Sequence, residues 1–321
     1  MKRLLACLLA LALVFAYSNG ALAKIPVRCD GPAMTKITAL AQAIGIAARR
    51  VLRMGGNAME PMRNPEMTDG EPAPGKMVKQ CLPEYAGTEV YHTVYLPADW
   101  HAGGSWPVVV EYTGSNMEVR NSCMGYGLTK GEGYIWLCLP YISRDHTHNE
   151  GSWWGDEQAT VEYCKRTVAA VCAAYGGEAV TLCGFSRGAV AVNYIGLYDD
   201  EIAALFSAFI ANDYYDGVFT GDYNSWGADP AWWETAGERL ARLGGRPQLI
   251  IQNDAVDRTL QIKCYLKRMG VDGDFTFLDV PVALLHGIPN AYFAYSHTDQ
   301  WLLFDNAYTA IVRDWLDAHG R

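Results

Sequence analysis

From Thr88 onward, short apolar runs alternate along the chain with longer segments of helical periodicity. Strands that are apolar on both faces and are separated by helices are typical of a mainly parallel sheet with helices on both faces. Right-handed crossovers bring the carboxyl ends of such strands to one edge, where the sites of α/β proteins form. We therefore predict an α/β fold. The expected strands are 90–96, 107–112, 134–139, 179–183, 204–210, 248–251 and 275–280, and the expected helices are 156–175, 187–197, 230–243, 259–269 and 301–319.

The first 23 residues have the features of a secretory leader. Lys2 and Arg3 precede an apolar run that ends at Tyr17, and Ala21-Leu22-Ala23 supplies a cleavage site of small residues. This pattern is typical of a signal peptide, and the apolar run is short for a membrane span. We expect cleavage after Ala23, which would give a secreted or periplasmic protein with no membrane association.

Residues 24–81 are expected to form an N-terminal extension that precedes the main domain over 82–321. The stretch from Thr35 to Met54 is rich in Ala, Ile and Leu and ends at Gly55-Gly56, which predicts a helix with a glycine stop. Segment 61–83 carries Pro, Gly and charged residues without periodicity and is predicted to be a linker.

Composition excludes several classes of protein. Half of the residues are hydrophobic and 19% are charged, as in a globular domain. The formal net charge is −9 and no basic stretch is present, so a nucleic acid partner is not expected. Cys7 leaves with the leader, and the even number of remaining cysteines permits disulfides in an exported chain. Because no Cys or His spacing suggests a zinc site, we expect no metal.

One motif carries chemistry. The expected strand 179–183 runs into Gly184-Phe185-Ser186-Arg187-Gly188, and a helix follows at once. A serine in a tight turn between strand and helix needs small neighbours, because the strand and the helix approach each other there. The turn also places the serine at a helix N-terminus, where developing negative charge is favoured. Ser186 is therefore predicted to be a nucleophile. The alternative is that the two glycines only form a tight βα turn, in which the serine has no catalytic role.

The chain from about Thr88 to its end resembles the α/β-hydrolase superfamily. The motif Gly184-Phe185-Ser186-Arg187-Gly188 carries most of this resemblance. Within the superfamily the chain is most similar to secreted esterases of the feruloyl, acetylxylan and polyhydroxybutyrate-depolymerase type. The resemblance implies the α/β-hydrolase fold, and the N-terminal extension lies outside it.

A serine hydroxyl needs a base to remove its proton, and the resemblance implies the chain order serine, acid, histidine. His297, just before the last expected helix, is the preferred base, and His286 is the alternative. The acid is expected after the strand 248–251, where Asp257 is preferred and Asp254 is the alternative. Asp213, after the preceding strand, is a further candidate.

Acyl transfer also needs two donors that face the developing oxyanion. One is expected to be the backbone N–H of Arg187, and the other is expected from Ser115 or its neighbours after the strand 107–112. Exposed aromatic side chains can stack on sugar rings or aromatic acyl groups, and Trp153, Trp154 and Tyr214 are the candidates for substrate binding.

These observations predict a secreted serine esterase that acts through an acyl-enzyme and needs no cofactor. An acylated polysaccharide, or an aromatic or short-chain ester, is the expected substrate. Two alternatives remain open at this point. The same residues would serve a serine peptidase of the prolyl-oligopeptidase kind, and a non-catalytic binding protein could keep the same fold.

Overall fold

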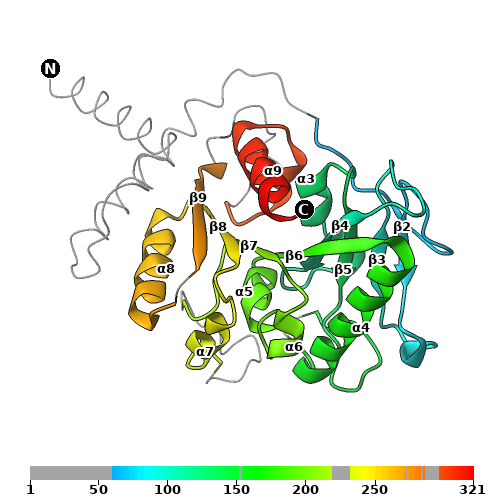
Figure 1. Ribbon diagram of the computed structural model, residues 1–321, viewed down its shortest axis with the longest axis horizontal. Coiled ribbons are helices and arrows are strands. Elements are labelled where there is room, and N and C mark those ends of the chain that lie inside the picture. The colour runs from blue at the N-terminus through cyan, green and yellow to red at the C-terminus, as the bar shows by residue number, and fades with distance from the viewer. Residues whose placement is uncertain (1–59, 152–153, 219–231, 272, 283–284, 286–295) are drawn as a thin grey trace, which may run out of the picture.

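The computed structural model describes residues 60–151, 154–218, 232–271, 273–282, 285 and 296–321 (Figure 1). The predicted leader over 1–23 and the predicted helix over 35–54 lie outside these residues. Among the described helices, none has the length and apolar character that crossing a lipid bilayer requires.

The described strands form one nine-stranded mixed sheet, with the order β1-β2-β3-β5-β4-β6-β7-β8-β9. Strands β4 to β9 run parallel, and β3 pairs antiparallel with both β2 and β5. The strands are β1 (Met67–Thr68), β2 (Met77–Gln80), β3 (His92–Tyr95), β4 (Trp106–Tyr112), β5 (Ile135–Leu139), β6 (Gly177–Phe185), β7 (Ala208–Asn212), β8 (Pro247–Asn253) and β9 (Asp274–Val280). The predicted mainly parallel sheet is confirmed.

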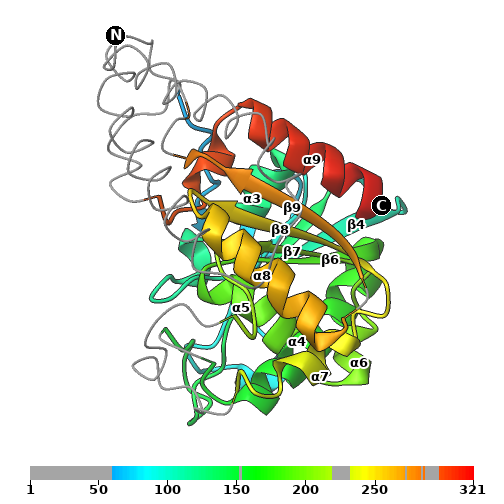
Figure 2. The same cartoon turned by 90° about the vertical axis from the view of Figure 1, so that its left-hand side faces the viewer.

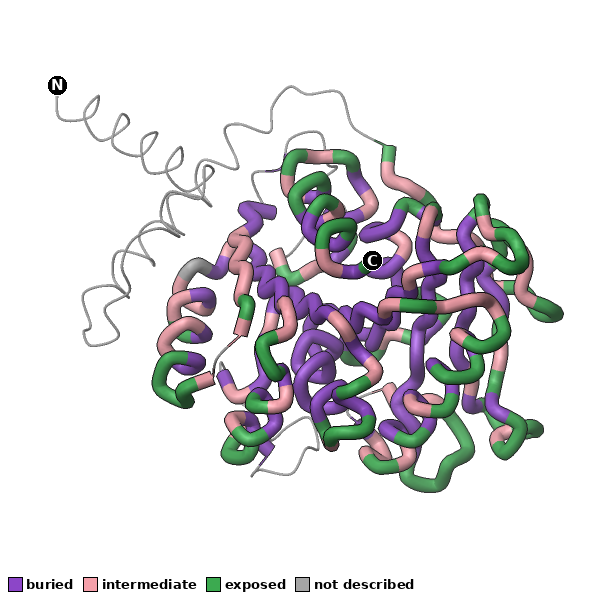
Figure 3. The backbone as a smooth tube through the Cα atoms, in the orientation of Figure 1, coloured by how far each residue is buried: buried purple, intermediate pink, exposed green. Residues whose placement is uncertain are grey.

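Helices cover both faces of the sheet, as predicted. One face packs against α4 (Glu157–Tyr175), α5 (Arg187–Tyr194), α6 (Asp200–Ala203), α7 (Ala236–Ala241) and α8 (Val256–Met269). The other face packs against α3 (Met124–Thr129), a 3₁₀ turn over Gln300–Leu303 and α9 (Ala307–His319). Figure 2 shows the sheet edge-on between these two layers, and Figure 3 shows that the interior of the sheet is mostly buried, with β6 buried from Val180 onward. Two further 3₁₀ turns are Pro83–Tyr85 and Val119–Asn121.

The linker predicted over 61–83 is wrong in part, because it contains two short strands. Met77–Gln80 forms β2, whose first two residues are buried, and it pairs with β3 over four residues. The short strand β1 pairs with β2 in turn. The sequence pattern missed these strands because an edge segment with one buried end has too few residues to show a period of two.

One predicted helix is interrupted. The segment 301–319 contains the 3₁₀ turn and α9, and Asn306 separates them. The Asn306 side chain accepts hydrogen bonds from the backbone N–H groups of Tyr308 and Thr309, and the Thr309 hydroxyl accepts one from the Asn306 backbone N–H. This reciprocal capping box starts a new helix at Ala307.

The disulfides that the even cysteine count permits do not join any two described cysteines. Cys123, Cys138, Cys164 and Cys183 are buried free thiols, and Cys81 is an exposed one. The first four behave as small apolar residues of the interior.

Gly188→Ala tests the packing of α5 on the sheet. A methyl group at Gly188 would lie 2.0 Å from the Tyr112 carbonyl oxygen, and backbone atoms cannot yield as a side chain does. We expect the substitution to lower the free energy of unfolding by about 3 kcal/mol or more, measured by urea denaturation. The control is Gly151→Ala, whose methyl would meet only Asn116 Oδ1 at 3.9 Å. Equal free energies of unfolding of the two variants would contradict close packing of Gly188 against the Tyr112 carbonyl.

Candidate active site

Ser186 lies in a strained turn between β6 and α5. Its backbone has φ 57° and ψ −120°, a conformation that is costly for a residue with a side chain. Two glycines make the turn possible. A methyl at Gly184 would lie 2.3 Å from the Gly188 backbone, and one at Gly188 would meet the Tyr112 carbonyl of β4. The Ser186 N–H donates to the Asn212 carbonyl at 2.9 Å, which fixes the turn to the end of β7.

Three side chains meet at this edge of the sheet. Ser186 Oγ lies 2.8 Å from His297 Nε2, and His297 Nδ1 lies 2.6 Å from Asp213 Oδ2. The Asp213 side chain is 2% exposed, whereas that of His297 is 40% exposed. A buried carboxylate therefore orients one nitrogen of an accessible imidazole, and the other nitrogen faces the serine. This geometry suits a nucleophile, a base and an orienting acid.

The acid preferred from the sequence is wrong in position. Neither Asp257 nor Asp254 is the carboxylate against His297; that place belongs to Asp213, directly after β7. Asp257 lies in the first turn of α8, where negative charge is favoured by the helix dipole. Asp254 has φ 49° and donates its N–H to the Val280 carbonyl, so it forms the turn after β8.

Residues at the end of β8 and in α8 support Asp213. The Asn253 N–H donates to Asp213 Oδ1 at 3.2 Å, and the Arg258 guanidinium donates to the same oxygen at 2.7 Å. Asn253 Nδ2 also donates to the Thr298 carbonyl at 2.7 Å, which holds the loop that carries His297. Asp213 itself has φ 64°, a left-handed conformation that aspartate tolerates better than most residues. Its position directly after a buried strand was the available sequence signal.

The turn after β4 lies beside Ser186. A Cβ built on Gly114 would be 3.5 Å from the Ser186 Cβ, and Ser115, the expected second donor, follows it on the exposed side. Arg187, the other expected donor, is the first residue of α5. Arg187 therefore directly follows the serine, and the residue that precedes Ser115 lies against it.

The Arg187 side chain supports the turn after β4 from the interior of the protein. Its guanidinium is buried, lies 3.9 Å from the centre of the Tyr141 ring and donates to the Gly114 carbonyl at 3.3 Å. The Tyr141 hydroxyl donates to the Thr113 carbonyl at 3.1 Å. The sequence motif gave no sign that this arginine would be buried.

A second buried group ends the loop that carries His297. Asp299 is buried, interacts with the Cys123 thiol, and burial raises the pKa of its carboxyl to about 6. Glu111 of β4 is buried nearby, where burial raises its pKa to about 7. Ser122, the backbone N–H groups of Met124 and Gly125, and Trp136 Nε1 all donate to Glu111. These contacts anchor the start of α3 below the site.

The aromatic residues expected to bind substrate differ in their surroundings. Trp154 is fully buried and stacks on Tyr194 with ring centres 5.0 Å apart, so its predicted surface role is wrong. Tyr214 lies edge-on to His297 at 5.0 Å and under the Arg258 guanidinium at 4.6 Å. Trp153 and the alternative base His286 lie outside the described residues. In the described ranges, no cluster of three or more His, Cys, Asp or Glu side chains has the placement of a metal site.

Comparison with known proteins finds similar solved structures and no similar sequence. No protein-family model matches the chain, and no curated protein matches its sequence. A thermostable esterase is 14% identical with a TM-score of 0.46, over 76% of this chain and 63% of the esterase. A ferulic acid esterase is 13% identical with a TM-score of 0.48, over 77% of this chain and 98% of the other. Dipeptidyl peptidase 4 of Porphyromonas gingivalis is 14% identical with a TM-score of 0.47, over 75% of this chain and 35% of the peptidase.

The fold assignment rests on this chain's own topology. A parallel sheet that presents a serine on a strained strand-to-helix turn, with a histidine from near the chain end beside it, is the arrangement of the α/β-hydrolase fold. The described part of the chain has this fold.

Asp213→Asn tests whether Asp213 or Asp257 is the acid that orients His297. An amide can present its NH₂ to His297 and favour the wrong imidazole tautomer, so we expect Ser186 to react with a fluorophosphonate about 10²–10⁴-fold more slowly. The matched control is Asp257→Asn, which should keep the wild-type rate. Labelling rates are followed by mass spectrometry of the intact protein. If labelling were slow in Asp257→Asn and had the wild-type rate in Asp213→Asn, Asp257 would be the acid, as predicted from the sequence.

Asp299→Asn tests the buried carboxyl through the pH dependence of stability. Its pKa is raised from 3.8 to about 6, so between these pH values the folded state keeps a proton that the unfolded state has released. The free energy of unfolding of the wild type therefore falls, relative to the variant, as the pH rises from 4 to 7, by up to about 3 kcal/mol.

Urea denaturation at several pH values measures this difference, and the exposed Asp274→Asn serves as the control. Parallel curves for wild type and Asp299→Asn would show that the carboxyl does not titrate in this window.

Proposed function

We propose that this chain is a serine carboxylic-ester hydrolase that acts through an acyl-enzyme. The observation that carries the proposal is the pair of short contacts that joins Ser186 Oγ, His297 and Asp213. The strained backbone of Ser186 supports it as well, because such strain is found mainly where function requires it. An exported chain with this chemistry would act on an external ester, and acylated plant polysaccharide is the proposed class.

In the proposed reaction, His297 Nε2 removes the Ser186 proton as Oγ attacks the ester carbonyl carbon. The carbonyl oxygen becomes an oxyanion, which the backbone N–H of Arg187 and an N–H of the Gly114–Asn116 turn would stabilise. Asp213 holds the imidazole and stabilises its charged form. His297 then protonates the leaving alcohol, and the acyl group stays on Ser186.

The second half of the reaction uses the same groups in reverse roles. Water takes the place of the alcohol, His297 accepts its proton, and the oxygen attacks the acyl carbon. The tetrahedral intermediate collapses, Ser186 Oγ leaves with the proton from His297, and the acid is released. The 40% exposure of the His297 side chain supports the approach of both an alcohol and water.

Ester turnover and covalent labelling test this proposal together. We expect the wild type to hydrolyse p-nitrophenyl acetate and to take up one fluorophosphonate on Ser186. Ser186→Ala should lose both, with turnover at least about 10³-fold lower. The exposed Ser105→Ala is the control for labelling, because Ser105 directly precedes β4 and so lies at the opposite end of that strand from the site.

Two results would count against the esterase. Cleavage of peptide anilides at a rate above that of the acetate would favour a serine peptidase. Absence of labelling in a folded wild-type protein would favour a non-catalytic binding protein.

A further inference from the structure

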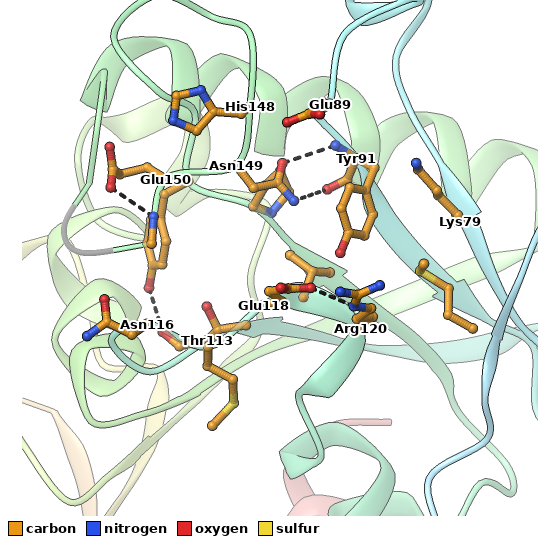
Figure 4. A pocket seen from close by; sticks show the side chains of 16 residues that line it. Lys79, Glu89, Tyr91, Thr113, Asn116, Glu118, Arg120, His148, Asn149 and Glu150 are labelled. Atoms are coloured by element: carbon orange, nitrogen blue, oxygen red, sulfur yellow. Dashed lines mark hydrogen bonds and ion pairs between the residues drawn. The ribbon is translucent and has the colours of Figure 1, made fainter.

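A cavity of about 590 Å³ lies beside the candidate active site. Its walls come from β2, from the segment before β3, from the turn after β4 and from residues 148–151 (Figure 4). This volume lies within the range of about 300–1,000 Å³ that small-molecule sites occupy. Ser186 is not among its lining residues, so the cavity is distinct from the position of the nucleophile.

The cavity shares a wall with the site. Thr113 and Asn116 line it, and Gly114 between them packs against Ser186. The Asn116 N–H donates to the Gly151 carbonyl at 2.5 Å, which joins the two loops that border the cavity. Tyr141 lines it as well, and the buried Arg187 lies on the ring of that residue. A group attached to an ester bound at Ser186 would therefore reach the cavity along the turn after β4.

One wall of the cavity is rigid. The Asn149 side chain accepts from the Tyr91 N–H and donates to the Tyr91 carbonyl, both at 3.0 Å. Figure 4 shows Tyr91 beside Asn149, with its hydroxyl directed toward Arg120. A wall fixed by a bidentate contact is preorganised, which reduces the entropy cost of binding.

The charges of the cavity are of both signs and largely neutralise one another. Glu118 and Arg120 form an ion pair at 2.5 Å, and the Lys79 ammonium lies 4.9 Å from the centre of the Tyr91 ring. Glu89 and Glu150 add negative charge on other walls. A highly charged ligand would meet repulsion from one sign or the other. Hydroxyl groups both donate and accept hydrogen bonds, so they can use carboxylates and cationic groups alike.

We propose that this cavity binds an uncharged, polyhydroxylated part of the ester substrate, such as a sugar unit. The proposal rests on the proposed esterase function and names the alcohol or acyl carrier that the enzyme selects. The triad supplies the chemistry, and the cavity supplies the preference for one class of ester over another.

The test compares two acetate esters, so that the acyl-enzyme is the same for both. One substrate is p-nitrophenyl acetate, which carries no hydroxyl groups, and the other is acetylated xylotriose. Lys79→Trp and Glu89→Trp place a bulky ring on exposed positions of the cavity wall. We expect each to lower kcat/KM for the sugar ester at least tenfold more than for p-nitrophenyl acetate, mainly through KM.

Lys76→Trp is the matched control, because it is exposed, precedes the same strand and does not line the cavity. It should leave the ratio of the two kcat/KM values at the wild-type level. An equal change of both substrates in the two cavity variants, or no change of either, would overturn the proposal.

A binding measurement separates failure of this proposal from failure of the proposed function. Folded Ser186→Ala protein should bind unmodified xylotriose in a calorimetric titration, and Lys79→Trp in the same background should weaken that binding at least tenfold. Binding of free ferulate in place of xylotriose would overturn the assignment in favour of an aromatic acid. If the wild type hydrolyses neither ester and yet binds xylotriose in this way, the proposed function fails and the sugar site stands.

Discussion

The backbone of Ser186, held at φ 57° and ψ −120°, is the constraint on which the site depends. A side chain in this conformation is strained, so the surrounding structure must hold it in place. Close approach of Gly184 to Gly188, and of Gly188 to the Tyr112 carbonyl, leaves α5 no room to shift on β4 and β6. The hydroxyl is therefore fixed at the carboxyl edge of the sheet before any substrate arrives.

The same edge explains how distant residues reach that hydroxyl. Strands β6, β7 and β8 run parallel and end side by side, so Ser186 and Asp213, which follow β6 and β7, lie beside Asn253, the last residue of β8. Asn253 contacts both Asp213 and Thr298, and so joins the acid to the loop that carries His297. The packed sheet thus brings the serine and the acid together, and the acid then orients the base.

The sequence predicted the parts of the molecule that depend on local pattern. Apolar runs and glycine spacing located the central strands and Ser186, and the loop before the last helix located His297. The acid was misplaced because proximity between strand ends is a property of the folded sheet: Asp213 and Asp257 both follow strands, and only folding decides between them. Trp154 was expected at the surface because composition does not distinguish an exposed indole from a buried one stacked on Tyr194.

Buried charged groups support both the turn at Gly114 and the loop of His297. Arg187 contacts the turn at Gly114, and Asp299 ends the loop of His297, although burial of either charge costs free energy. An apolar side chain would fill the same space at lower cost, yet it could not hydrogen-bond a carbonyl or a thiol. Because the turn at Gly114 also forms a wall of the polar cavity, Arg187 and Tyr141 link the shape of that cavity to the position of the expected oxyanion donors.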